Sequence, residues 1–252
     1  MWWKVIDLKK WDRFIDTLDL EPLFVTVSGA HLYGFPSPDS DVDLRGCHQL
    51  PLRAIVGLKE PNQTYKKDGY HDEIEIDIVS HDIGKYFGLL VKNNGYVLEQ
   101  IFSPLVVRGQ EFLDELRPIA VRCVTKHHYH HYRGFYASQR RLIDKQQQKR
   151  AKAILYAYRV LMTGIHLMRT GLIEANLLNL NQEFGFSYLD ELVASKVTEK
   201  VAPQGLNWDF HAANLDRLET QLAQEFERST VTEYRDADAV NELLVRLRLA
   251  SV

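Results

Sequence analysis

A run of strictly alternating side chains places the strongest constraint on how this chain folds. From residue 73 to residue 78, acidic and β-branched residues alternate. Successive side chains of a strand point to opposite faces, so Glu73, Glu75 and Asp77 share one face and the isoleucines share the other. The run therefore predicts a strand. A strand buried on one side, with a solvated acidic face, explains the same pattern equally well without any function.

Strand and helix signals also alternate before this run. Strands are expected at residues 23–27, 41–47 and 63–67, and an amphipathic helix is expected at residues 11–18. The dipeptide Asp68-Gly69 favours a tight hairpin turn just before the alternating strand. This order of elements is typical of α/β or α+β proteins.

From His81 onward, helical periodicity replaces the strand signals. In residues 151–171 apolar side chains recur at spacings of four and three, and Gly171 suits the C-terminal cap of the helix they predict. Further helices are expected at residues 189–200, 209–228 and 236–249. We therefore predict an α+β chain, with a small mixed-sheet core in residues 1–118 and a helical subdomain in residues 119–252.

Two aspartates separated by one residue, Asp41 and Asp43, give the first chemical signal. Along a strand their carboxylates point to the same face, with Cα atoms roughly 6.5–7 Å apart. Mg²⁺ prefers oxygen ligands, and two-metal phosphoryl-transfer sites hold their ions about 4 Å apart. Taken alone, such a pair also occurs in many acidic loops. A calcium loop starting at Asp39 is a poorer explanation, because Leu44 and Leu50 stand where glycine and glutamate are needed.

A third acid and a glycine turn complete the candidate site. Asp77 is favoured over Glu75 as the third acid because the most apolar residues flank it. The strand expected at residues 23–27 leads directly into Ser28-Gly29. Glycine there lets the backbone approach a phosphate, and the following turn can present N–H groups to the anion. Many strands end in glycine, so this turn gains meaning only beside the acids.

Two segments together resemble the nucleotidyltransferase superfamily of DNA polymerase β: VSGAHLYGFPSPDSDVDLRG at residues 27–46 and IEIDIVSHD at residues 74–82. The order matches a glycine turn after a strand, then an acidic pair, then a third acid on a later strand. The DSDxDLRG element, VLEQ at residues 97–100 and YAYRVLMTGIHLMRTG at residues 156–171 resemble, more narrowly, predicted nucleotidyltransferases associated with RNA ligases. This resemblance covers about residues 25–180.

The resemblance implies transfer of a nucleoside monophosphate from an NTP to an acceptor hydroxyl, with an RNA end in RNA repair as the expected acceptor. It implies that Asp41 and Asp43 hold two Mg²⁺ ions, which Mn²⁺ can replace. Asp77 is implied to bind the metal nearest the acceptor and to help deprotonate the acceptor hydroxyl. The residues implied to touch the triphosphate are Ser28, Gly29 and Ser40. Arg45 either neutralises phosphate or anchors the end of its strand.

One residue departs from the superfamily pattern. Ala30 stands after the turn glycine, where Gly or Ser is usual in the superfamily. The resemblance therefore implies the loss of a hydroxyl contact to phosphate, unless the Ser28 side chain faces the site and replaces it. This departure motivates an alternative, in which the chain is a non-catalytic nucleotide-binding or RNA-binding module. A second alternative keeps the chemistry but transfers the nucleotide to a protein or a small molecule.

Positive charge is concentrated in the second half of an otherwise acidic chain. Residues 122–159 hold ten Lys or Arg residues and one acid, Asp144, although the whole chain has a net charge of −3. On a helix, Lys152 and Arg159 would lie on a basic stripe opposite the apolar one, and we expect this stripe to bind triphosphate or a nucleic-acid acceptor. A solvated helix face is the alternative.

Aromatic and histidine residues near this stripe have two possible roles. Tyr132 and Tyr156 would stack on bases or, as is more common, pack in the core. His127 and His131 are four residues apart on a predicted helix, but no third zinc ligand is apparent, so phosphate contact or plain surface is favoured over a metal site.

We expect a cytoplasmic protein without a membrane partner. No apolar run approaches the roughly 18 residues that span a bilayer, and the start of the chain lacks a signal-peptide core. Cys47 and Cys123 match no disulfide or zinc spacing and are expected to be buried.

Overall fold

The computed structural model describes residues 6–198 and 206–250, and its contacts divide the chain into two compact units. The first unit comprises Met1–Leu32, Ser40–Cys123 and Tyr234–Val252, and the second comprises Tyr33–Asp39 and Val124–Glu233. The domain boundary at residues 118 and 119 stays a prediction. The first compact unit runs slightly past it, to Cys123, and also includes the last helix of the chain.

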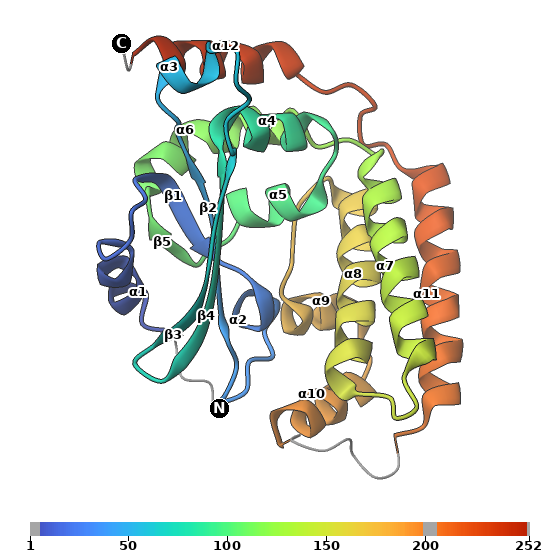
Figure 1. Ribbon diagram of the computed structural model, residues 1–252. Coiled ribbons are helices and arrows are strands. Elements are labelled where there is room, and N and C mark those ends of the chain that lie inside the picture. The colour runs from blue at the N-terminus through green and yellow to red at the C-terminus, as the bar shows by residue number, and fades with distance from the viewer. Residues whose placement is uncertain (1–5, 199–205, 251–252) are drawn as a thin grey trace. The chain divides into compact units, whose positions relative to one another are not determined.

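A mixed sheet forms the centre of the first unit. Within the described residues it has five strands in the order β3-β4-β2-β1-β5 (Figure 1). Their bounds are β1 Pro22–Val27, β2 Val42–His48, β3 Thr64–His71, β4 Ile74–Asp82 and β5 Val106–Arg108. β2 and β4 run parallel, whereas all other neighbours are antiparallel. The predicted α+β class with a mixed sheet is confirmed.

Helices cover both faces of this sheet. The helices of the first unit are α1 Leu8–Ile15, α2 Gly29–Tyr33, α3 Leu52–Ile55, α4 Ile83–Val91, α5 Gly95–Ile101, α6 Gln110–Val121 and α12 Ala237–Leu249. On one face, Trp11 and Phe14 of α1 join a buried cluster with alternate residues of β1, β2 and β4. On the other face, Phe24 of β1 contacts Tyr86 of α4 and Phe112 of α6. Alternation along β1, β2 and β4 thus separates a largely apolar face from a face that carries the acids.

From Ile74 onward the alternating run is a strand, as predicted, but its first residue, Glu73, lies in the hairpin turn, which is not where it was predicted. β3 continues through Asp68-Gly69, and the two-residue turn is Asp72-Glu73, between the paired residues His71 and Ile74. Asp72 and Glu73 have φ values of 47° and 64°, the left-handed conformation of a type I′ turn. The predicted turn at Asp68-Gly69 was wrong. Both residues pair with β4, and the hydrogen bonds of the two strands continue beyond them to His71 and Ile74.

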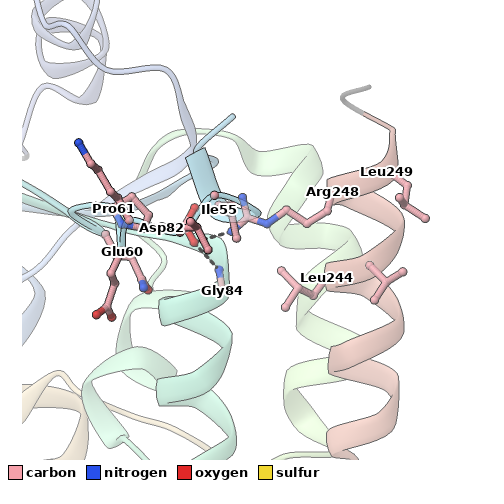
Figure 2. Close-up of a pocket in the computed structure, with 13 residues that line it drawn as sticks. Ile55, Glu60, Pro61, Asp82, Gly84, Leu244, Arg248 and Leu249 are labelled. Carbon is pink, nitrogen blue, oxygen red and sulfur yellow. Dashed lines mark hydrogen bonds and ion pairs between the residues drawn. The ribbon is translucent and has the colours of Figure 1, made fainter. Parts of the chain in front are cut away.

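A buried ion pair joins the last helix to the rest of the first unit. Arg248 of α12 binds Asp82, the N-cap residue of α4 (Figure 2). Its Nη1 also donates to the Leu50 carbonyl at 3.1 Å. Asp82 is 2% exposed and accepts hydrogen bonds from the backbone N–H groups of Leu50 and Gly84 at 2.9 Å. The pair borders a pocket of about 650 Å³ between α3, the loop after it, and α12. None of the three candidate aspartates lines this pocket.

The second unit is helical. Its helices are α7 His128–Lys145, α8 Ala151–Thr170, α9 Leu177–Phe184, α10 Tyr188–Thr198 and α11 Trp208–Arg228. α8 is buried along most of its length, packs against the other four helices and ends at Gly171, whose φ of 71° confirms the predicted cap. The helix predicted at residues 189–200 corresponds to α10, and the last two residues of that range lie outside the described residues. No helix in the described parts of the chain has the length and apolar composition needed to cross a membrane.

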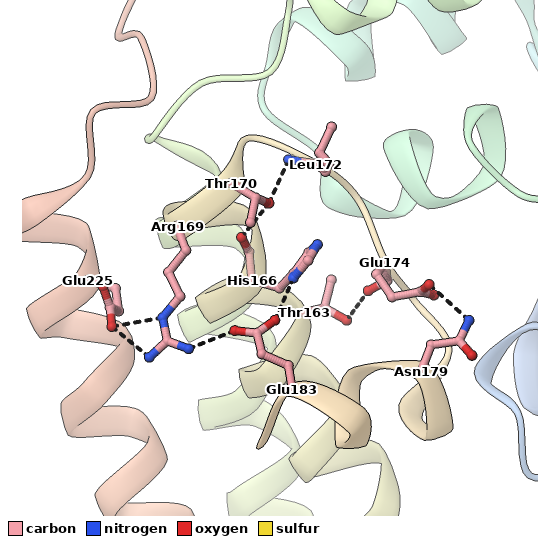
Figure 3. A network of polar contacts seen from close by, with 9 residues as sticks. All are labelled: Thr163, His166, Arg169, Thr170, Leu172, Glu174, Asn179, Glu183 and Glu225. Carbon is pink, nitrogen blue, oxygen red and sulfur yellow. Dashed lines mark hydrogen bonds and ion pairs between the residues drawn. The ribbon is translucent and has the colours of Figure 1, made fainter. Parts of the chain in front are cut away.

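A polar network on α8 fixes its neighbours in this unit. Arg169 binds Glu183 of α9 at 2.7 Å and Glu225 of α11 at 2.8 Å (Figure 3). His166, one turn earlier on α8, shares a hydrogen bond of 2.8 Å with the other oxygen of Glu183. Because one arginine serves carboxylates from two helices, the network ties α9 and α11 to the end of α8.

Candidate active site

The parallel pairing of β2 and β4 brings two of the predicted acids together. Asp43 lies directly opposite Asp77 in the register of these strands. Val42 and Leu44 on β2, like Ile76 and Ile78 on β4, point to the apolar face and are at most 3% exposed. The side chains of Asp43 and Asp77 keep 18% and 32% of their surface exposed on the opposite face. Burial of the aliphatic residues therefore fixes the direction in which both carboxylates point.

Arg45 bridges these two carboxylates. Its Nη2 donates to Asp43 Oδ1 and to Asp77 Oδ2, each at 2.8 Å. Its Nη1 donates to the carbonyl oxygens of Leu44 at 2.9 Å and Asp77 at 2.8 Å. Of the two roles considered from the sequence, these contacts match the anchoring of a strand, and they extend it to neutralising two acids.

The glycine turn packs closely against the side chain of Asp43. β1 pairs with β2 as far as Val27 and Leu44, and the Ser28 N–H then donates to the Asp43 carbonyl at 2.8 Å. Gly29 follows with a φ of +59°, and a Cβ atom on it would stand 1.8 Å from Asp43 Oδ2. Only glycine suits both this backbone conformation and this approach. The conformation of the turn and the position of the Asp43 side chain therefore depend on each other.

The remaining predicted residues of the first unit lie close to these in the chain. Asp41 immediately precedes β2, two residues before Asp43, and is partly buried, as is Ser40. Ser28 is 8% exposed, and Ala30, the departure from the superfamily pattern, is 2% exposed on the short helix α2. The structure therefore gathers Ser28, Gly29, Asp43 and Asp77, and it places Asp41 at the entry of the same strand.

The carboxylates of these residues are suitable ligands for a hard divalent cation, but their present arrangement is not a complete metal site. In the described residues, no group of three or more His, Cys, Asp or Glu side chains is arranged to hold a metal ion as it stands. The Arg45 guanidinium occupies the position between Asp43 and Asp77. Asp77 Oδ1 is buried and has no hydrogen-bond partner among the described residues. A buried oxygen without a donor suits a cation, and carboxylate oxygens are the ligands that Mg²⁺ prefers.

Another acid joins this row, and the sequence analysis missed it. Asp68 lies directly opposite Asp77 on β3, so Asp43, Asp77 and Asp68 form a row across three adjacent strands. Placing Asp68 in a turn concealed this position. The sequence did indicate that the strand before the alternating run pairs with it. The register that places Asp68 opposite Asp77, however, follows only when the turn is placed at Asp72-Glu73. Like charges directly opposite one another destabilise a sheet, which increases the demand for a cation here.

The two predicted basic contacts lie in the second unit and differ from each other. Lys152 is exposed near the start of α8. Arg159 is fully buried, and its guanidinium carbon lies 4.0 Å from the centroid of the Tyr33 ring. The prediction that Arg159 belongs to an exposed basic stripe was wrong. The stripe also lacks a continuous helix, because α7 ends at Lys145 and α8 begins at Ala151.

Several other positive charges in this region serve the helical fold. Lys149 Nζ donates to the carbonyl oxygens of Ile143 and Gln146 at 2.9 and 2.7 Å, and thereby caps α7. Arg140 binds Asp216 of α11 at 2.6 Å. Burial lowers the pKa values of His128 and His131 to about 4, so both are neutral at pH 7. The exposed cations at the junction of α7 and α8 are Arg141, Lys145, Arg150 and Lys152.

The aromatic candidates pack inside the second unit. Tyr132 is 1% exposed, and the Tyr156 ring contacts the rings of Tyr33 and Phe35 at centroid distances of 5.4 and 5.6 Å. Both contacts match core packing, the more common of the two roles considered for them. No metal-binding group that includes His127 and His131 occurs in the described residues.

The comparison with known families identifies the class of protein, the nucleotidyltransferase superfamily of DNA polymerase β. Within that class, the chain belongs to the RNA repair pathway DNA polymerase beta family (RlaP), whose model matches residues 4–246. The chain is also similar to the uncharacterized protein MJ0002 of Methanocaldococcus jannaschii, with 33% identity over 156 residues. That match covers 60% of this chain and 61% of the relative.

Proposed function

We propose that this protein is a Mg²⁺-dependent nucleotidyltransferase that transfers a nucleoside monophosphate from an NTP to an acceptor hydroxyl. One observation carries the proposal: Asp43 and Asp77 lie opposite each other on neighbouring parallel strands, and Gly29 packs closely against the Asp43 side chain. Membership of the RNA repair pathway DNA polymerase beta family supports the same chemistry. Asp41, two residues before Asp43, would complete the set of metal ligands.

In this proposal each residue has a defined task. Bound metal ions would neutralise the triphosphate and the charge that develops at phosphorus. Asp41 and Asp43 would hold the metal ions and orient the triphosphate through them, and Ser28, Gly29 and Ser40 would lie against the triphosphate.

Asp77 would take the proton of the acceptor hydroxyl as the hydroxyl oxygen bonds to the α-phosphorus. The bond from that phosphorus to the oxygen bridging it to the β-phosphorus breaks, and pyrophosphate leaves.

We further propose that the acceptor is an RNA end. The family is named for an RNA repair pathway. The exposed cations at the junction of α7 and α8, Lys152 among them, supply the positive charge that contact with a phosphate backbone requires. Because Arg159 and Lys149 are engaged within the fold, the basic surface proposed here is smaller than the sequence predicted.

The test is transfer of label to RNA from each of the four α-labelled NTPs. Wild-type protein is incubated with Mg²⁺ and RNAs that differ in their termini, next to Asp41→Ala and the control Asp19→Ala, which removes an exposed acid of the same unit. We expect transfer by the wild type and the control, and a loss of at least about a hundredfold for Asp41→Ala. Absence of transfer from every NTP, or equal transfer by Asp41→Ala, would sink the proposal.

Two other outcomes would identify the alternatives. Label on protein or on a small molecule in a lysate, with none on RNA, indicates a different acceptor. NTP or RNA binding that needs no metal and survives loss of Asp41, Asp43 and Asp77 indicates the non-catalytic module that Ala30 motivates.

A further inference from the structure

Both terminal nitrogens of the Arg45 guanidinium are fully hydrogen-bonded, one to backbone carbonyl oxygens and the other to carboxylates. Each of its two outer nitrogens carries two N–H groups, and the four hydrogen bonds to Leu44, Asp43 and Asp77 use all of them. The Nη1 atom donates to two backbone carbonyl oxygens, whose positions are set by the pairing of β2 and β4. The Nη2 atom is held by two carboxylates, which are able to turn toward another cation. The two ends of this guanidinium thus differ in how easily they are released.

The position of Nη2 is the position that a cation shared by the two strands would take. Asp43 Oδ1 and Asp77 Oδ2 both lie 2.8 Å from it. Oxygen ligands of Mg²⁺ lie about 2.1 Å from the ion, so a small inward movement of both carboxylates would suffice. A guanidinium and a divalent cation therefore compete for the same two oxygen atoms. Without any cation there, two carboxylates directly opposite each other would repel.

We propose that Arg45 is the resident counter-cation of this site. It holds Asp43 and Asp77 in place in the metal-free protein and releases both carboxylates when a divalent cation binds, while Nη1 keeps its backbone bonds. This inference rests on the proposed metal site and adds to it a positioning residue that sets metal affinity. After release, the Nη2 atom would bind an anionic oxygen of the triphosphate, which is the phosphate-neutralising role considered for Arg45 from the sequence.

The competition gives two effects of opposite sign when Arg45 is removed. The metal-free protein loses stability, because the two carboxylates lose their neutralising partner. Metal affinity rises, because no guanidinium has to be displaced. Lysine keeps the charge but not the fork that reaches two carboxylates and two carbonyls, so Arg45→Lys should lie between wild type and Arg45→Ala in both measurements. A purely structural arginine would show only the loss of stability.

The test is Mn²⁺ binding, followed by the loss of the free-ion signal in electron paramagnetic resonance, together with thermal unfolding with and without Mn²⁺. Arg108→Ala is the matched control, because Arg108 also bridges two carboxylates of the first unit, Asp12 and Asp16, at 2.7 Å each. We expect Arg45→Ala to bind Mn²⁺ about tenfold more tightly than wild type and to melt at a lower temperature without metal. Arg108→Ala should lower the melting temperature but leave Mn²⁺ affinity unchanged.

Mn²⁺ affinity that is unchanged or weaker in both Arg45→Ala and Arg45→Lys overturns the inference, and the lysine variant keeps this result accessible if the alanine variant fails to fold. If wild type binds Mn²⁺ and loses it on Asp43→Asn, the metal site stands even when the inference about Arg45 fails. If no variant binds Mn²⁺, the metal site and the inference fail together.

Discussion

Gly29 combines two constraints that no other residue type satisfies together. Its φ of +59° costs an L-residue about 1–2 kcal/mol, and a Cβ atom would overlap Asp43 Oδ2 at 1.8 Å. We expect Gly29→Ala to lower the free energy of unfolding by about 2–4 kcal/mol and to abolish nucleotide transfer, because Asp43 must move aside. Urea denaturation and the label-transfer assay measure the two effects.

Gly185 offers the matched control. Its φ is +69°, but a Cβ atom there would meet nothing within 4 Å. Gly185→Ala should therefore cost about 1 kcal/mol and leave transfer unchanged. Equal losses of stability and of transfer in the two variants would show that the close approach of Gly29 to Asp43 does not contribute to the site.

The residues of the site were partly predictable from the sequence. Asp43 and Asp77 follow from the alternation of polar and apolar residues, since that pattern alone decides which side chains share a face. The bridge through Arg45 was not predictable, because it depends on which strands are neighbours and in which register. Arg159 was misassigned for a related reason. Helical periodicity located its face on α8, but other helices cover that helix along most of its length.

At the scale of elements, the two halves of the chain differed in how well the sequence predicted them. The long helix α8 was predicted to within one residue, because its apolar spacing and its capping glycine agree. The hairpin was misplaced, because Asp68-Gly69 is a stronger local turn signal than Asp72-Glu73. Long-range pairing with β4 outweighed that preference, which a reading of local sequence cannot detect.

The helix α12 offers a prediction at this scale. Arg248 pairs with Asp82, and both side chains are largely buried, at 11% and 3% exposed. Removing one partner of a buried pair leaves an uncompensated charge, so Arg248→Ala should lower the free energy of unfolding by about 3 kcal/mol. Urea denaturation of the full chain measures it.

Arg246 is the control on the same helix. It pairs with Glu115, but their side chains are 58% and 45% exposed, and Arg246→Ala should cost less than about 1 kcal/mol. Equal losses for the two variants would show that α12 is not held to the first unit through Asp82.

At the scale of the whole molecule, the acids and the exposed cations belong to different units. The first unit carries Asp41, Asp43 and Asp77, and the second carries the cations at the junction of α7 and α8. The sequence predicted the amount of positive charge in residues 122–159 but not its use, because capping and ion pairing within the helical unit engage part of it. The proposed chemistry therefore depends on the first unit and the proposed acceptor on the second.

The most direct measurement of the central claim is the rate of label transfer from an α-labelled NTP to RNA for wild type, Asp77→Asn and Glu75→Gln. Both acids lie on the same face of β4, but only Asp77 is opposite Asp43 and bound by Arg45. We predict that Asp77→Asn lowers the rate at least about a hundredfold and that Glu75→Gln stays close to wild type. An undiminished rate for Asp77→Asn, or a loss confined to Glu75→Gln, would contradict the assignment of the site.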